Sequence, residues 1–119
     1  MRKILTVDDS SSIRQMVNFT LGKAGYEVIE AVDGKDGLDK ASGQKFDLIV
    51  TDLNMPNMDG IELLSHIKAS ETWKGVPVVM VSTEGSQAKV LEAVQLGAAG
   101  YVRKPFNAEQ IKEKLAAFF

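Results

Sequence analysis

The sequence has 119 residues, of which 45% are apolar and 25% charged, with a formal net charge of −2 and no cysteine. This length predicts one domain over residues 1–119, and the missing cysteines exclude a disulfide scaffold, a thiolate metal site and a thiol nucleophile. The weak negative charge argues against a nucleic-acid-binding protein, and no apolar run is long enough to insert into a membrane. The N-terminus also lacks the apolar stretch of a signal peptide, so we expect a cytoplasmic protein.

Five short apolar segments predict strands, and segments of helical length lie between them. The predicted strands cover residues 3–7, 26–30, 47–51, 76–81 and 99–103. The first predicted helix follows capping serines and has apolar residues at steps of three and four, namely Ile13, Met16, Val17 and Leu21. The second and third helices cover residues 35–42 and 61–69, and Gly25, Gly43 and Gly97 stand where helices are expected to stop. The fourth contains Val90, Leu91 and Val94 and ends at Gly97, and the fifth starts near Asn107 and is expected to bury Ala108, Ile111, Leu115 and Phe118.

The strict alternation of strand and helix predicts an α/β fold with a parallel sheet covered by helices on both faces. Residues 48–50 and 78–81 are apolar without alternation, which is typical of central strands that are buried on both sides. Residues 26–30 partly alternate between polar and apolar, which favours an edge strand.

Charged residues follow three of the predicted strands. Asp8 and Asp9 end the first, Asp52 ends the third just before a loop rich in Pro and Gly, and Lys104 ends the fifth. In open α/β folds, ligands bind at the carboxyl ends of the strands. The sequence therefore predicts an acidic cup with one cation beside it, which suits a hard divalent metal and a phosphoryl group.

Mg²⁺ prefers oxygen ligands and commonly takes one or two carboxylates while keeping bound waters. Asp9 and Asp52 can supply the carboxylates, the main-chain carbonyl of Asn54 a further oxygen, and Asp8 can hold a metal-bound water. The simpler alternative is that Asp8 and Asp9 are only an acidic pair at a helix N-terminus, stabilised by the helix dipole. Without a cation, neighbouring carboxylates would repel each other, which favours the metal interpretation.

Four motifs in this order resemble the response-regulator receiver domain, in particular the stand-alone CheY-like kind. They are residues 7–10 (VDDS), 51–60 (TDLNMPNMDG), 77–82 (PVVMVS) and 97–106 (GAAGYVRKPF), and the similarity runs over essentially the whole chain. The resemblance implies a doubly wound (βα)5 fold of the flavodoxin-like type, with five parallel strands in the order 2-1-3-4-5.

The resemblance also implies site roles. Asp52 would take a phosphoryl group from a phosphohistidine of a sensor histidine kinase. Asp9, Asp52 and the Asn54 carbonyl would hold Mg²⁺, with Asp8 acting through a water. Lys104 would contact a phosphoryl oxygen.

The remaining implied roles concern the switch. Ser82 would move to bind another phosphoryl oxygen, Tyr101 would turn inward as it does so, and the Lys104–Pro105 peptide would be cis. Two positions vary the family pattern. Ser82 stands where Thr is also common, and Thr83 stands where smaller residues are frequent, so its bulk could limit access to the phosphoryl group.

These features predict a monomeric response regulator that switches partner binding, with a flagellar-motor type of target in chemotaxis as the first expectation. It would not be an enzyme beyond promoting its own phosphoryl transfer and autodephosphorylation. A phosphorelay shuttle is the alternative. A Mg²⁺-dependent aspartyl-phosphate phosphatase is disfavoured because Asn54 cannot transfer protons. Flavin-binding electron transfer on the same topology is disfavoured because Asp8 and Asp9 would repel the flavin phosphate.

Overall fold

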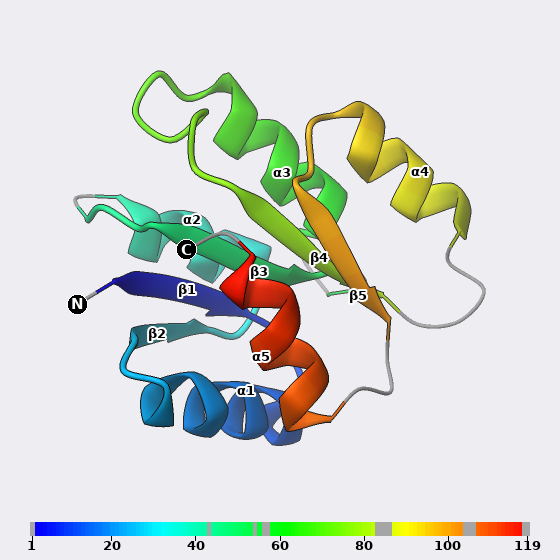
Figure 1. The fold of residues 1–119 in the computed structure, drawn as a ribbon. Helices are drawn as coiled ribbons and strands as arrows, with labels where there is room; N and C mark the ends of the chain where they lie inside the picture. Colours follow the sequence, from blue (N-terminus) through cyan, green and yellow to red (C-terminus); the bar gives the residue numbers. More distant parts are fainter. Residues whose placement is uncertain are drawn as a thin grey trace.

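The computed structural model describes residues 2–42, 44–53, 55, 58–82, 87–103 and 107–117. One five-stranded sheet lies at its centre (Figure 1), with all neighbouring strands parallel and in the order β2-β1-β3-β4-β5. The strands are β1 (Lys3–Val7), β2 (Glu27–Ala31), β3 (Leu48–Asp52), β4 (Val78–Ser82) and β5 (Gly100–Arg103). The helices are α1 (Ser11–Lys23), α2 (Gly34–Ala41), α3 (Gly60–Ala69), α4 (Gln87–Gln95) and α5 (Ala108–Ala116). The predicted fold class and strand order are confirmed.

The sheet separates two hydrophobic cores, because alternate residues of each strand point to opposite faces. On one face Leu5, Ile49 and Met80 belong to a core covered by α2, α3 and α4. On the other face Ile4, Val50 and Val79 belong to a core covered by α1 and α5. All five residues of β3 are buried, as expected for the central strand, and β2 lies at an edge as predicted.

Strand and helix boundaries differ from the predicted ones by one or two residues. The predicted strand 76–81 begins later, at Val78, because Pro77 has no N–H and the Val76 amide donates to the Trp73 carbonyl in a turn. The predicted strand 47–51 continues to Asp52, which pairs with Val81 of β4. This extension matters because it fixes the main chain of Asp52 within the sheet.

Two predicted helix stops are confirmed by their backbone geometry. Gly25 and Gly97 have φ angles of +97° and +106°, in the left-handed region that glycine adopts without a Cβ clash. The third predicted stop, Gly43, lies outside the described residues.

The helices differ in how much of their apolar surface they bury. In α5, Ile111 and Leu115 are fully buried as predicted, while the Ala108 side chain and Phe118 lie outside the described residues. In α4 the periodic apolar residues do form a helix, but Leu91 is 59% and Val94 49% exposed. Apolar periodicity indicates a helix without telling whether the apolar face is covered by the same chain.

Candidate metal and phosphoryl-acceptor site

Asp8 and Asp52 come together because β1 and β3 are neighbours in register. Val7 pairs with Thr51, so the residues that follow, Asp8 and Asp52, lie side by side at the carboxyl edge of the sheet. Both are buried, at 5% and 4% exposure. Asp9 is exposed, and one carboxylate oxygen from each of the three aspartates lies within 4.8 Å of the others. The acidic cluster predicted from the sequence is therefore present.

The segment that carries Asp8 and Asp9 is held by its own hydrogen bonds. The Asp8 amide donates to the Ala31 carbonyl (3.1 Å), which continues the β1–β2 ladder by one residue. The Asp8 carboxylate accepts from the Ser10 amide (2.8 Å), and the Ser10 hydroxyl accepts from the Ile13 amide (3.4 Å) as the N-cap of α1. The acidic pair thus lies at the start of α1, where the helix dipole favours negative charge.

Arg14 binds the same segment and was not singled out from the sequence. Its Nη1 donates to the main-chain carbonyl of Asp8 (2.6 Å), and its Nε donates to the Glu30 carboxylate (3.2 Å). An arginine one turn inside a helix is unremarkable in sequence. The one sequence feature that could have pointed to this contact is that Arg14 follows Asp8 by six residues, at the start of the first predicted helix.

The opposite wall is set by the close approach of α3 to the end of β3. The Leu53 amide donates to the Val81 carbonyl (3.0 Å), and the Gly60 amide donates to the Leu53 carbonyl (2.9 Å). A Cβ at Gly60 would collide with the Asp52 carbonyl oxygen, so only glycine fits there without a shift of the main chain. Asp59 caps α3 by accepting from the Glu62 amide (2.9 Å).

A weak ion pair connects α4 to this wall. The Nζ of Lys89 lies 3.9 Å from the carboxylate of Asp59, and both side chains are partly exposed. No sequence pattern predicts this contact, since Asp59 and Lys89 are 30 positions apart.

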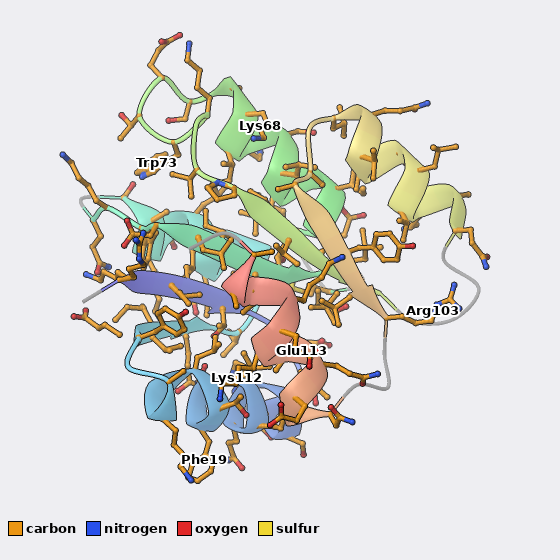
Figure 2. All side chains as sticks on the ribbon, viewed as in Figure 1. Phe19, Lys68, Trp73, Arg103, Lys112 and Glu113 are labelled. Atoms are coloured by element: carbon orange, nitrogen blue, oxygen red, sulfur yellow. The ribbon has the colours of Figure 1, made fainter. Side chains whose placement is uncertain are left out.

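The other predicted site residues are described only in part. The main chain of Ser82 pairs with Arg103, at the carboxyl end of β5 (Figure 2), but the Ser82 side chain lies outside the described residues. Asn54, Lys104 and Thr83 also lie outside them, as does the predicted cis peptide bond. Tyr101 is 44% exposed, with Lys114 Nζ 5.8 Å from its ring centroid.

The donor set suits a hard cation. It consists of carboxylate oxygens alone, two of them on buried residues, and no sulfur or imidazole is among them. Oxygen-only sites favour Mg²⁺, Ca²⁺ or Mn²⁺ over Zn²⁺ and Cu²⁺. Asp9 leaves the cluster open to solvent on one side, which gives an ion and its waters room to enter.

A sequence profile described as "Response regulator receiver domain" matches residues 4–116. The chain belongs to this family. The receiver domain is 44% identical over 118 residues to chemotaxis protein CheY-3 of Vibrio cholerae serotype O1, covering 98% of this chain and 91% of that protein. It is 43% identical to chemotaxis protein CheY of Pseudomonas aeruginosa, with 98% and 95% covered.

Solved structures agree with this assignment. The receiver domain superposes on chemotaxis response regulator CheY4 of Vibrio cholerae with a TM-score of 0.94 and 44% identity, covering 100% of this chain and 99% of that one. A response regulator receiver domain protein from Clostridium thermocellum gives a TM-score of 0.89 at 29% identity, covering 99% and 94%. None of the receiver helices that the structure describes could span a membrane.

Proposed function

We propose that this receiver domain is a chemotaxis-type response regulator whose Asp52 accepts a phosphoryl group from a phosphohistidine of a sensor histidine kinase. The observation that carries the proposal is the position of Asp52. It ends the central strand, is 4% exposed, and lies within a cluster of three carboxylates open to solvent at Asp9. The similarity to chemotaxis proteins over 98% of the chain supports the pathway.

Mg²⁺ is the cation that we assign to the cluster. Asp9, Asp52 and the main-chain carbonyl of Asn54 would hold it, with Asp8 acting through a bound water. When bound, the ion would supply positive charge next to the transferred phosphoryl group.

Phosphoryl transfer asks chiefly for positioning and charge neutralisation, because its transition state is loose. An oxygen of the Asp52 carboxylate would form the new bond to phosphorus while the phosphorus–nitrogen bond to the kinase histidine breaks. The histidine nitrogen keeps the electron pair of that bond. Lys104 would contact one phosphoryl oxygen, and the Ser82 hydroxyl would donate to another. Water would later cleave the same acyl phosphate, giving autodephosphorylation.

The output surface would be the face formed by α4, β5 and α5. Its described apolar residues include Leu91, Val94, Leu96 and Tyr101, each at least 40% exposed. Exposed apolar residues gathered on adjoining elements are typical of a protein-binding surface. The partner we infer is a flagellar motor switch protein bound by a monomeric, cytoplasmic regulator.

Labelling with acetyl phosphate and MgCl2 tests the phosphoacceptor. Mass spectrometry of the wild-type protein should show one added phosphoryl group. EDTA added before acetyl phosphate should prevent this labelling. Asp52→Asn should abolish labelling, because an amide is not a nucleophile. Asp39→Asn, at an exposed position of α2, is the matched control and should label normally. Full labelling of Asp52→Asn on the same timescale would refute the assignment.

A further inference from the structure

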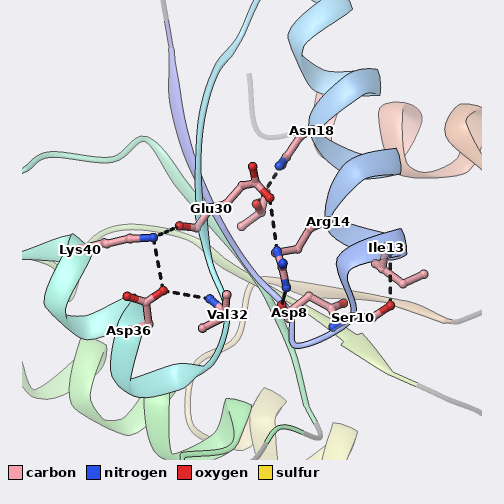
Figure 3. Close-up of polar contacts among 10 residues, drawn as sticks. Asp8, Ser10, Ile13, Arg14, Asn18, Glu30, Val32, Asp36 and Lys40 are labelled. Atoms are coloured by element: carbon pink, nitrogen blue, oxygen red, sulfur yellow. Dashed lines mark hydrogen bonds and ion pairs between the residues drawn. The ribbon is translucent and has the colours of Figure 1, made fainter.

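Arg14 bridges three elements next to the acidic cluster (Figure 3). It lies on α1, donates to the Asp8 carbonyl beyond the end of β1, and pairs with Glu30 on the edge strand β2. Its side chain is only 15% exposed, whereas that of Glu30 is 50% exposed. Burying most of an arginine costs rotamer entropy and desolvation, so the position favours a specific task over a chance surface ion pair.

The bond at Asp8 is of the stronger kind. A charged guanidinium donates to a main-chain oxygen at 2.6 Å, and hydrogen bonds with an ionised partner are stronger than neutral ones. The accepting oxygen belongs to the peptide group that joins Asp8 to Asp9. Because a peptide group is planar, fixing its oxygen fixes the direction in which the chain continues to Asp9.

Two further bonds meet at Asp8. Its amide is held by the Ala31 carbonyl, and its carboxylate by the Ser10 amide. The first bond holds Asp8 against β2, and the second holds its side chain at the start of α1. The bond from Arg14 acts on the peptide group between the two aspartates, and Asp9 itself is exposed.

We propose that Arg14, clamped between the Glu30 carboxylate and the Asp8 carbonyl, is a positioning residue that orients the Asp8–Asp9 peptide for Mg²⁺ binding. This inference rests on the metal site of the proposed function. Groups that orient metal ligands without touching the metal commonly change metal affinity by about 10- to 100-fold when they are removed. We therefore expect loss of Arg14 to weaken Mg²⁺ binding about tenfold.

Electrostatics alone predicts the opposite sign. A guanidinium beside a cation site repels the cation, so removing its charge should tighten Mg²⁺ binding. Arg14→Met thus separates the two effects by the direction of the change. Arg14→Lys keeps the charge, but one ammonium group cannot reproduce the forked donors that reach Glu30 and Asp8 together.

Lys40 supplies a matched control. It lies in the same polar network, donating to the Glu30 carbonyl (2.5 Å) and pairing with Asp36 (3.3 Å), and these contacts do not include Asp8. Lys40→Met removes one positive charge from the same side of the molecule. Its Mg²⁺ affinity should stay within about twofold of wild type.

The experiment titrates MgCl2 into the full chain and follows calorimetry together with the backbone amide NMR shifts of residues 8–10. Both Arg14 variants should raise the Kd about tenfold, and Lys40→Met should not. Urea denaturation in EDTA tests whether each variant is folded. If Arg14→Met is unfolded, Arg14→Lys alone tests the effect on Mg²⁺ binding. If the wild type binds Mg²⁺ and the Arg14 variants bind it equally well or more tightly, the role of Arg14 is refuted but the metal site is not. Absence of Mg²⁺ binding by the wild type would overturn the metal site as well.

Discussion

At the scale of single side chains, the main feature of the site is the close approach of three carboxylates. Asp8 and Asp52 are almost completely buried, and their oxygens lie within 4.8 Å of each other and of Asp9. Two like charges about 4 Å apart repel by about 4 kcal/mol at an effective dielectric constant of 20. Solvent reduces this for the exposed Asp9. The fold maintains this repulsion because the strand register brings Asp8 and Asp52 to the same edge.

The Asp9→Ala variant should reveal this strain. Mg²⁺ affinity should fall strongly, because one of the proposed ligands is lost. Stability without metal should be equal or rise by up to about 1 kcal/mol as repulsion is relieved. Urea denaturation with EDTA and with MgCl2 measures both quantities. A large loss of stability in EDTA would contradict the expectation.

At the scale of elements, the start of α3 is locked to the end of β3. The Gly60 amide bonds to the Leu53 carbonyl, and a Cβ at Gly60 would lie 3.0 Å from the Leu53 Cα as well as colliding with the Asp52 carbonyl. Main-chain atoms of a buried strand cannot move aside cheaply. The start of α3 and the end of β3 therefore behave as one rigid unit.

Gly60→Ala should consequently destabilise the protein by about 1–3 kcal/mol, the usual cost of overpacking. It should also weaken Mg²⁺ binding, because any relief must shift Asp52. The matched control is Gly22→Ala in α1, where a Cβ would meet nothing within 4 Å. That change should be neutral or stabilise by about 0.5 kcal/mol through better helix propensity. Thermal denaturation measures the stability of both variants. Equal effects of Gly60→Ala and Gly22→Ala would contradict the close packing of α3 on the end of β3.

Elements were easier to predict from the sequence than the contacts between them. The strands predicted at 3–7 and 47–51 were recognisable from short apolar runs, and the alternation of strand and helix predicted the parallel sheet. The meeting of Asp8, Asp9 and Asp52 followed from the rule that parallel strands end at one edge. The hydrogen bond from Arg14 to the Asp8 carbonyl did not follow, because it depends on how α1 lies across β1 and β2, and no residue pattern encodes that angle.

Exposure was the other quantity that the sequence did not determine. The apolar stripe of α4 has the spacing of a core-facing helix, yet Leu91 is 59% exposed. Phe19 of α1 is also 68% exposed and points away from the sheet (Figure 2). Whether an apolar residue is covered depends on the neighbours that tertiary packing supplies, which a local pattern cannot show.

At the scale of the whole molecule, the site and the proposed output surface are joined through β4 and β5. Ser82 ends β4 and pairs with Arg103, and Tyr101 pairs with Met80 on the same two strands. Forms that differ by a few kcal/mol can be exchanged by a phosphoryl group that favours one of them. Movement of the Ser82 hydroxyl toward Asp52 would leave room for the Tyr101 ring to turn inward.

NMR spectra of the phosphorylated and unphosphorylated protein, both saturated with Mg²⁺, test this route. Shift changes should gather at the acidic cluster and at residues 84–96 and 99–104, and should spare residues 13–21 of α1. Ser82→Ala should still be phosphorylated at Asp52 but should show reduced changes at 99–104. Larger remote changes on α1 than on α4 would contradict the route.

The sparse burial of α4 has an energetic consequence of its own. Among its described side chains only Ala93 is buried, whereas α3 buries Gly60, Leu63, Leu64 and Ile67. The free energy needed to open a segment locally rises with the apolar surface that the segment buries. Detaching or tilting α4 therefore requires far less free energy than unfolding the domain. Of the described α4 residues only Ala93 is a buried member of the first hydrophobic core, and none belongs to the second, so the helix can change its position while most of the sheet packing stays in place. In the proposed switch, α4 could therefore move without unfolding the domain.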